Sequence, residues 1–163
     1  MTAINETQTL VNLASPKMGT KIISVSDEFF GEATRMLSDQ EPVFIEDKYD
    51  THGKWMDGWE SKRRRDGGND WAIIKLGSPG IISTIEVDTS FFTGNFPPFF
   101  SLEGTDSKEI PKNDNEWIPL ITKSSLIGDQ KNNFNIESNI TLNYVRLQIF
   151  PDGGVARLRL FGE

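Results

Sequence analysis

The chain has 163 residues, of which 36% are hydrophobic and 25% are charged, and its formal net charge is -7. This length and composition suit one domain with a hydrophobic core and are not typical of a disordered tail. The negative charge argues against nucleic acid and anionic membranes as partners, because both attract positive charge.

The first part of the chain is predicted to hold little regular structure. Residues 1–12 have the character of a polar lead-in, and residues 13–163 are predicted to form the single domain. A short strand is expected at 21–25, followed by a helical turn around 32–37, the one helix that the pattern supports. Residues 40–50 contain proline and are expected to be extended.

Strand patterns recur at regular intervals beyond residue 70. The alternation of apolar and polar residues in Tyr144–Ile149 predicts a strand with one face in solvent, and Val155–Leu160 repeats it. Gly77–Gly80 and Pro151–Gly154 have turn compositions, so the last two strands are expected to be antiparallel neighbours. Strands are predicted at 71–76, 81–87, 99–103, 116–121, 134–136, 144–150 and 156–161.

Seven or eight short strands with Gly/Pro turns and almost no helix predict an all-β fold, either a sandwich or a barrel. We favour a jelly-roll β-sandwich. In such a fold the sheets fix the frame and the loops at one end hold ligands.

Residues 52–65 form the most chemically varied loop. Within it, Trp55 and Trp59 accompany the carboxylates Asp57 and Glu60 and the basic run Lys62–Arg65. In one interpretation Trp59 belongs to the core and the charges are solvated. In the other, an arginine fork grips an anionic ligand while Asp57 or Glu60 orients it.

Two further polar stretches follow strand patterns. Residues 88–98 begin with Asp88 at a predicted strand end and offer hydroxyl, amide and backbone donors. The alternative is an ordinary turn in which Asp88 caps its own backbone. Pro151–Gly154 is an ordinary hairpin composition, and it precedes Arg157 on a predicted strand, where a guanidinium would be held firmly.

The chain has no cysteine and one histidine, His52, which excludes disulfides, thiol nucleophiles and zinc sites built from cysteine or several histidines. The common hydrolase, P-loop and dinucleotide motifs are absent. No cofactor is predicted. The residue types permit a divalent metal ion held by oxygen ligands from Asp57, Glu60, Asp88 or Asp152. No signal-like or membrane-spanning stretch is visible, so the cytoplasm is the expected location.

Five segments, in this order and spacing, resemble the allantoicase family across residues 13–162, nearly the whole chain. The segments are Ser26–Phe30, Gly53–Glu60 with Arg63-Arg64, Asp70–Ile74, Glu86–Asn95 and Phe150–Arg157. The resemblance implies a jelly-roll domain like galactose-binding domains. It also implies hydrolysis of allantoate to ureidoglycolate and urea, a step of purine breakdown.

Members of that family carry two tandem copies of this domain, and the chain is most similar to the first. The resemblance therefore implies that a site shared between copies would be rebuilt as a homo-oligomer or by pairing with a second repeat. A non-catalytic module that binds a ureido compound or a sugar is the alternative function.

For allantoate, an arginine would bind the carboxylate, amide and hydroxyl groups would bind the ureido groups, and a carboxylate with a raised pKa would supply acid–base catalysis. Trp59 and Phe92 would exclude water. This scheme requires the three loops to meet at one rim of the domain. The candidate catalytic residues are Asp57, Glu60 and Asp88. The candidate substrate-binding residues are Lys54, Trp59, Arg63, Arg64, Thr89, Phe92, Thr93, Gly94, Asn95, Asp152 and Arg157.

Overall fold

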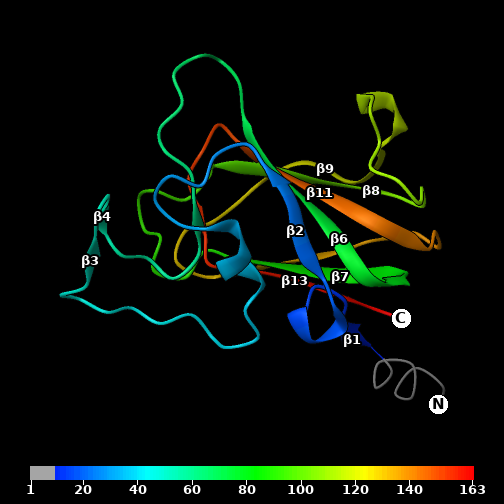
Figure 1. Ribbon diagram of the computed structural model, residues 1–163, viewed down its shortest axis with the longest axis horizontal. Helices are drawn as coiled ribbons and strands as arrows, with labels where there is room; N and C mark the ends of the chain where they lie inside the picture. Colours follow the sequence, from blue (N-terminus) through cyan, green and yellow to red (C-terminus); the bar gives the residue numbers. More distant parts are fainter. Residues whose placement is uncertain (1–9) are drawn as a thin grey trace.

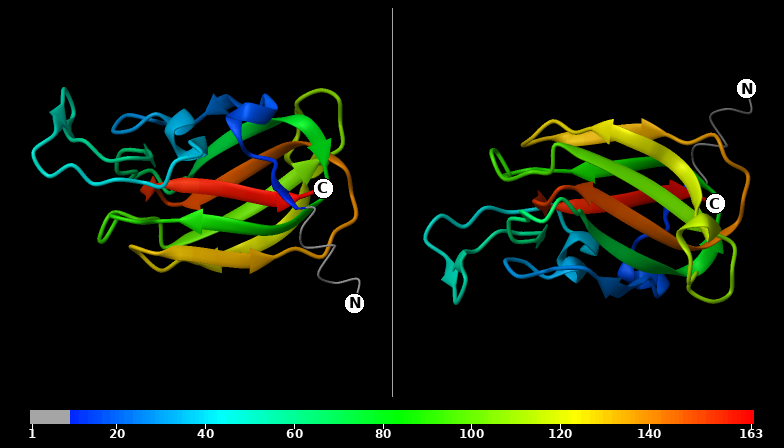
Figure 2. Two further views of the ribbon diagram at one scale, coloured as in Figure 1. Left: turned by 90° about the horizontal axis from the view of Figure 1, so that it is seen from below. Right: turned by 90° about the horizontal axis from the view of Figure 1, so that it is seen from above.

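The computed structural model describes residues 10–163 and consists mainly of two antiparallel sheets packed face to face (Figures 1 and 2). The five-stranded sheet has the order β2 (Lys21–Val25), β6 (Asp70–Gly80), β11 (Leu142–Phe150), β8 (Phe99–Thr105) and β9 (Ile118–Ser125). The four-stranded sheet has the order β1 (Val11–Asn12), β13 (Arg157–Gly162), β7 (Ile82–Asp88) and β10 (Lys131–Asn135). The predicted all-β sandwich is confirmed.

Within residues 10–163, two small ladders and three short 3-10 helices complete the fold. The ladders pair β12 (Gly154–Val155) with β5 (Trp59–Glu60), and β3 (Tyr49–Asp50) with β4 (Gly53–Lys54). The helical turn expected around 32–37 is present as the 3-10 helix η2 (Ala33–Leu37), whereas η1 (Pro16–Met18) and η3 (Asp114–Glu116) were not predicted. Among residues 10–163, no helix has the length and apolar character needed to cross a membrane.

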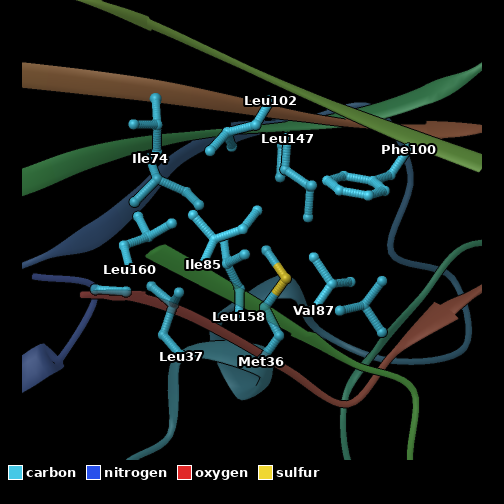
Figure 3. Packing of buried hydrophobic residues seen from close by; sticks show 14 of the residues in the cluster. Met36, Leu37, Ile74, Ile85, Val87, Phe100, Leu102, Leu147, Leu158 and Leu160 are labelled. Carbon is cyan, nitrogen blue, oxygen red and sulfur yellow. The ribbon is translucent and has the colours of Figure 1, made fainter. Parts of the chain in front are cut away.

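The core lies between the sheets and is closed on one side by η2 (Figure 3). In β11, Val145, Leu147 and Ile149 are fully buried while Arg146 and Gln148 are only partly covered, as the predicted alternation requires. Figure 3 shows Leu147 with its neighbours on one side, Ile85, Val87 and the β13 leucines on the other, and Met36 and Leu37 from η2 below.

The prediction that the last strand has one face in solvent is wrong. Arg157 and Arg159 of β13 are only 2% and 8% exposed. Arg157 Nε donates to the carbonyl of Gln40 (2.8 Å), and Arg159 Nη1 donates to the carbonyl of Ser38 (3.0 Å). The segment after η2 thus covers the polar face of β13. A local pattern gives no sign of this cover, because the covering residues lie about 120 positions earlier in the chain.

The two predicted turns also behave differently from expectation. The strand β6 continues through Gly77–Gly80, and β11 pairs with β6 and β8 rather than with β13. Both Gly/Pro stretches lie where the chain passes from the five-stranded sheet to the four-stranded sheet. Gly77 is needed there because a Cβ atom would lie 1.8 Å from the Met18 carbonyl oxygen. Turn composition therefore marked sheet changes and not hairpins.

The predicted N-terminal lead-in, residues 1–12, falls largely outside the described residues. Its last two residues form β1, in which Val11 lies opposite Gly162 and Asn12 lies opposite Phe161. The strand predicted at 116–121 begins instead at Ile118 and continues to Ser125, since η3 occupies the residues just before it.

Candidate functional site

Three connections far apart in sequence meet at one end of the sandwich. They are the stretch after β5, the connection between β7 and β8, and the turn between β11 and β12. Together they border a cleft of about 590 Å³. Its lining residues are Phe30, Glu60, Ser61, Arg63, Arg64, Gly94, Asn95, Phe96, Pro98, Pro151, Asp152 and Gly153. The predicted convergence of the three loops at one rim is therefore present.

Hydrogen bonds donated by backbone N–H groups fix these loops to one another. Ser61 N donates to the carbonyl of Gly153 (3.1 Å), and Gly153 N donates to Ser61 Oγ (3.2 Å). Arg64 N donates to Asp152 Oδ2 (2.7 Å), and Gly154 N donates to the carbonyl of Asn95 (2.8 Å). The turn at 151–154 thus holds the other two loops together. Asp152 serves this purpose through its side chain, and the residue also lines the cleft.

Glu60 is the one predicted catalytic carboxylate that lines the cleft. Its backbone is fixed by β5 and by hydrogen bonds with Gly31 in both directions (3.1 Å each). Asn95 Nδ2 donates to Glu60 Oε2 (3.0 Å), which joins two of the three predicted loops. Burial raises the pKa of Glu60 above its ordinary value, and the hydrogen bond from Asn95 opposes that shift. A raised pKa is the property that acid–base catalysis by a carboxylate needs near neutral pH.

The two arginines at the cleft differ in their partners. Arg64 is bound to Asp66 by two hydrogen bonds (3.0 Å each) and to the buried Asp70 through Nη1 (2.7 Å). Arg63 is exposed, and its guanidinium forms no hydrogen bond or ion pair with any residue in the range 10–163. Arg63 therefore retains all of its donors for an anionic ligand, whereas Arg64 holds its own loop in shape.

The predicted residues Asp57 and Arg157 lie away from the cleft and form a buried ion pair. Arg157 Nη2 donates to Asp57 Oδ2 (2.8 Å), and the two side chains are 2% and 10% exposed. The same guanidinium donates to the carbonyls of Arg35, Gln40, Asp57 and Ala156. With its donors occupied inside the protein, Arg157 cannot grip a ligand, and Asp57 serves as its counter-ion.

Asp88 and Thr89 also turn inward. Asp88 is fully buried and accepts hydrogen bonds from Ser90 N (2.9 Å) and Ser90 Oγ (2.6 Å), the self-capping arrangement considered as the alternative for this loop. Thr89 Oγ1 donates to the carbonyl of Ile127 (2.7 Å), which ties the loop to a neighbouring connection. Neither residue borders the cleft, because the end of β7 is covered by the loops that it anchors.

The remaining predicted residues, Trp59, Phe92, Lys54 and Thr93, do not line the cleft either. Trp59 is fully buried and its Nε1 donates to the carbonyl of Asp27 (2.8 Å), and Phe92 is fully buried in a small cluster with Met56 and Ala156. Lys54 belongs to the β3–β4 hairpin, and Thr93 is exposed beside the cleft without lining it. Trp59 and Phe92 thus support the loops from below instead of walling off the cleft.

Sequence reasoning did not single out several residues that line the cleft: Phe30, Ser61, Phe96, Pro98, Pro151 and Gly153. Phe30, Pro151 and Gly153 could have been found from the sequence, because they lie in segments that carry the allantoicase resemblance. The others are apolar or small residues next to the predicted ones, and no chemical signal separates them from ordinary loop residues. Within residues 10–163, no three His, Asp or Glu side chains are grouped so that they could hold a metal ion.

Comparison with known proteins agrees with the resemblance found in the sequence. The allantoicase-repeat family model matches residues 11–163. A protein named probable allantoicase from Acinetobacter baylyi is 48% identical over 154 residues, which cover 94% of this chain and 46% of the relative. A solved structure of allantoicase superposes with a TM-score of 0.83 at 31% identity, covering 94% of this chain and 48% of that one.

The fold extends to sugar-binding proteins. The family 32 CBM from C. perfringens NanJ, solved in complex with galactose, matches with a TM-score of 0.64 at 12% identity, covering 94% of this chain and 99% of that one. This likeness confirms the galactose-binding-type jelly roll and concerns the fold alone. The chain spans about half the length of the curated relatives that it matches. The family model and the 48% identity show that this chain belongs to the allantoicase family.

Proposed function

We propose that this chain hydrolyses allantoate to ureidoglycolate and urea at the cleft lined by Glu60, Arg63 and Asn95. The observation that carries the proposal is the pairing, in one cleft, of a half-buried carboxylate of raised pKa with a guanidinium that has no internal partner. Allantoate needs both kinds of group, because it carries a carboxylate and two ureido groups on one carbon.

Arg63, Asn95 and Glu60 each have a defined task in this reaction. Arg63 binds the allantoate carboxylate through its unoccupied donors. Asn95 orients Glu60 by donating to Oε2, and its own carbonyl oxygen can accept from a ureido N–H group. Glu60 gives a proton to the nitrogen of the departing urea, which is a poor leaving group without it.

The bonds and protons balance with Glu60 alone. As the C–N bond breaks, the proton from Glu60 goes to the urea nitrogen and urea leaves. The oxygen of a water molecule bonds to the same carbon and gives ureidoglycolate. A proton of that water returns to the Glu60 carboxylate, which restores the starting state. The raised pKa of Glu60 favours the protonated form with which the cycle begins.

Incubating the purified chain with allantoate tests the proposal directly. We expect urea and ureidoglycolate to appear in equal amounts. Thermal stabilisation by allantoate without release of urea would indicate a binding module instead. If allantoate neither stabilises the chain nor is hydrolysed to urea, that result would contradict both functions.

Replacing Arg63 by Ala is expected to raise KM for allantoate about 10- to 100-fold, with a smaller change in kcat. A hydrogen bond to a charged group contributes roughly 1.5–3 kcal/mol, and Arg63 would lose such bonds to the carboxylate. Steady-state kinetics of urea release measures the change.

Arg65→Ala is the matched control for this substitution, because Arg65 belongs to the same exposed basic run but does not line the cleft. Equal KM changes in the two variants would contradict a specific role for Arg63 and would indicate general attraction of an anion to the basic run.

A further inference from the structure

Two polar side chains that line the cleft, those of Ser61 and Asp152, have no task in the proposed reaction. Ser61 is 3% exposed, and its Oγ accepts a hydrogen bond from Gly153 N (3.2 Å). Within residues 10–163, the Ser61 hydroxyl donates to no group. Asp152 Oδ2 accepts from Arg64 N (2.7 Å), while Oδ1 has no hydrogen-bond or ion-pair partner in the same part of the chain. One hydroxyl donor and one carboxylate acceptor are therefore left for a ligand.

The turn at 151–154 holds these two groups next to each other. Asp152 directly precedes Gly153, whose N–H donates to Ser61 Oγ and whose carbonyl accepts from Ser61 N (3.1 Å). Gly153 has a φ of +135°, and a Cβ atom there would lie 2.8 Å from the carbonyl oxygen of Asn95. Because only glycine fits this close approach, the turn lies firmly against the β7–β8 connection. The positions of the hydroxyl and the carboxylate are thus set before a ligand binds.

A donor beside an acceptor is complementary to a terminal ureido group. The carbonyl oxygen of such a group accepts one hydrogen bond, and the NH2 beside it donates another from the same edge. The Ser61 hydroxyl matches the carbonyl oxygen, and Asp152 Oδ1 matches the NH2. A hydrogen bond from NH2 to a carboxylate is charge-assisted, so it is stronger than one between neutral groups.

We propose that Ser61 and Asp152 bind the ureido group that allantoate retains, and that they make the cleft selective for its terminal NH2. This inference rests on the proposed function, because it concerns the substrate of the same cleft. It adds to the site Ser61, which the sequence did not single out. It also gives Asp152 a second role besides fixing the backbone of Arg64.

The charge of Asp152 decides which end of the ligand it accepts. Asp152 repels the carboxylate of allantoate, whereas Arg63 in the same cleft attracts it. A ureido group is consequently directed to Ser61 and Asp152. Glu60 protonates the nitrogen of the ureido group that departs, so the group bound by Ser61 and Asp152 is the one that stays on the carbon.

Two unreactive ligands separate this recognition from catalysis. Ureidoacetate has a carboxylate and one ureido group, and it lacks the second ureido group on the same carbon. N-acetylglycine has the same outline with a methyl group in place of the terminal NH2. We expect isothermal titration calorimetry to show that the unaltered chain binds ureidoacetate about 10- to 100-fold more tightly, because only ureidoacetate donates to Asp152 Oδ1.

Replacing Asp152 by Asn tests the acceptor and keeps the anchor of the loop. The amide oxygen still accepts from Arg64 N, while Nδ2 presents donors in place of the free oxygen. We expect the preference for ureidoacetate over N-acetylglycine to be lost. Asp106→Asn is the matched control, because Asp106 is exposed, follows β8 and does not line the cleft. It should keep the preference.

Replacing Ser61 by Ala is expected to weaken the binding of both ligands by a similar factor, about 2- to 10-fold. The carbonyl group that the Ser61 hydroxyl binds is present in both, so their affinity ratio should be unchanged. Thermal unfolding of each variant separates a lost contact from a lost fold, and Asp152→Asn keeps the test decisive if Ser61→Ala unfolds.

The absence of binding, equal affinity of the unaltered chain for the two ligands, or a preference that survives Asp152→Asn would overturn the inference. The proposed function is tested separately. Urea release from allantoate without a preference for ureidoacetate would support hydrolysis and refute the role of Ser61 and Asp152. A preference that Asp152→Asn abolishes, in a chain that releases no urea, would support ureido recognition and refute hydrolysis.

Discussion

Replacing Glu60 by Gln is expected to lower kcat for urea release about 10²- to 10⁴-fold, with little change in KM. Gln keeps an oxygen that accepts the hydrogen bond from Asn95 Nδ2, so the geometry of the cleft is preserved. It cannot give a proton to the departing urea, and general acid–base catalysis typically contributes a factor of this size. Steady-state rates with allantoate measure the effect.

Glu32→Gln is the matched control for Glu60→Gln, because Glu32 is exposed beside η2 and does not line the cleft. It should leave kcat unchanged. A Glu60→Gln variant with the rate of the unaltered protein would remove Glu60 from the chemistry and with it the proposed mechanism.

The pH dependence of kcat/KM gives an independent view of Glu60. Burial raises its pKa, so its protonated form persists to a higher pH than that of an ordinary glutamate. With protonated Glu60 as the proton donor, kcat/KM should fall as the pH rises through this raised pKa, and the fall should be absent in Glu60→Gln. A rate that instead falls as the pH decreases through the same pKa would identify Glu60 as a base toward water.

Replacing Arg157 by Met is expected to lower the free energy of unfolding by about 3–5 kcal/mol. The substitution leaves the buried Asp57 carboxylate without its counter-ion and removes one of the donors to the carbonyls of Gln40 and Arg35. Removing one member of a buried ion pair typically costs this amount, because the other charge stays buried. Guanidinium chloride unfolding, followed by tryptophan fluorescence, measures the change.

Arg63→Met is the control for Arg157→Met, since it removes an exposed guanidinium that has no partner among residues 10–163. Its stability should stay within about 0.5 kcal/mol of the unaltered protein. A stable Arg157→Met variant with a raised KM for allantoate would contradict the structural role of Arg157 and would support the substrate-binding role predicted from sequence.

Much of the architecture was accessible from the sequence because strand formation depends on local alternation. The patterns at 21–25, 99–103 and 144–150 gave strands with only small shifts in their ends. The polar loop residues Glu60, Arg63 and Asn95 were identifiable because their side chains have the chemistry that a ureido carboxylate requires, and the family resemblance joined the three loops to one reaction.

Contacts between segments far apart in the sequence decided where the individual charged side chains and turns lie in the fold. Asp57 and Glu60 are three residues apart and have similar side chains, yet Asp57 meets Arg157, 100 positions later, while Glu60 meets Asn95 at the cleft. Likewise, Pro151–Gly154 has a hairpin composition but carries the chain from one sheet to the other.

The sequence by itself determined where the long strands of the two sheets lie, which loops carry polar chemistry and which family the chain resembles. Only the tertiary structure decided which carboxylate faces the cleft and which guanidinium is buried. The physical reason is that the environment of a charged side chain depends on the segments packed around it, and hydrogen bonds over about 35–120 positions set that environment here.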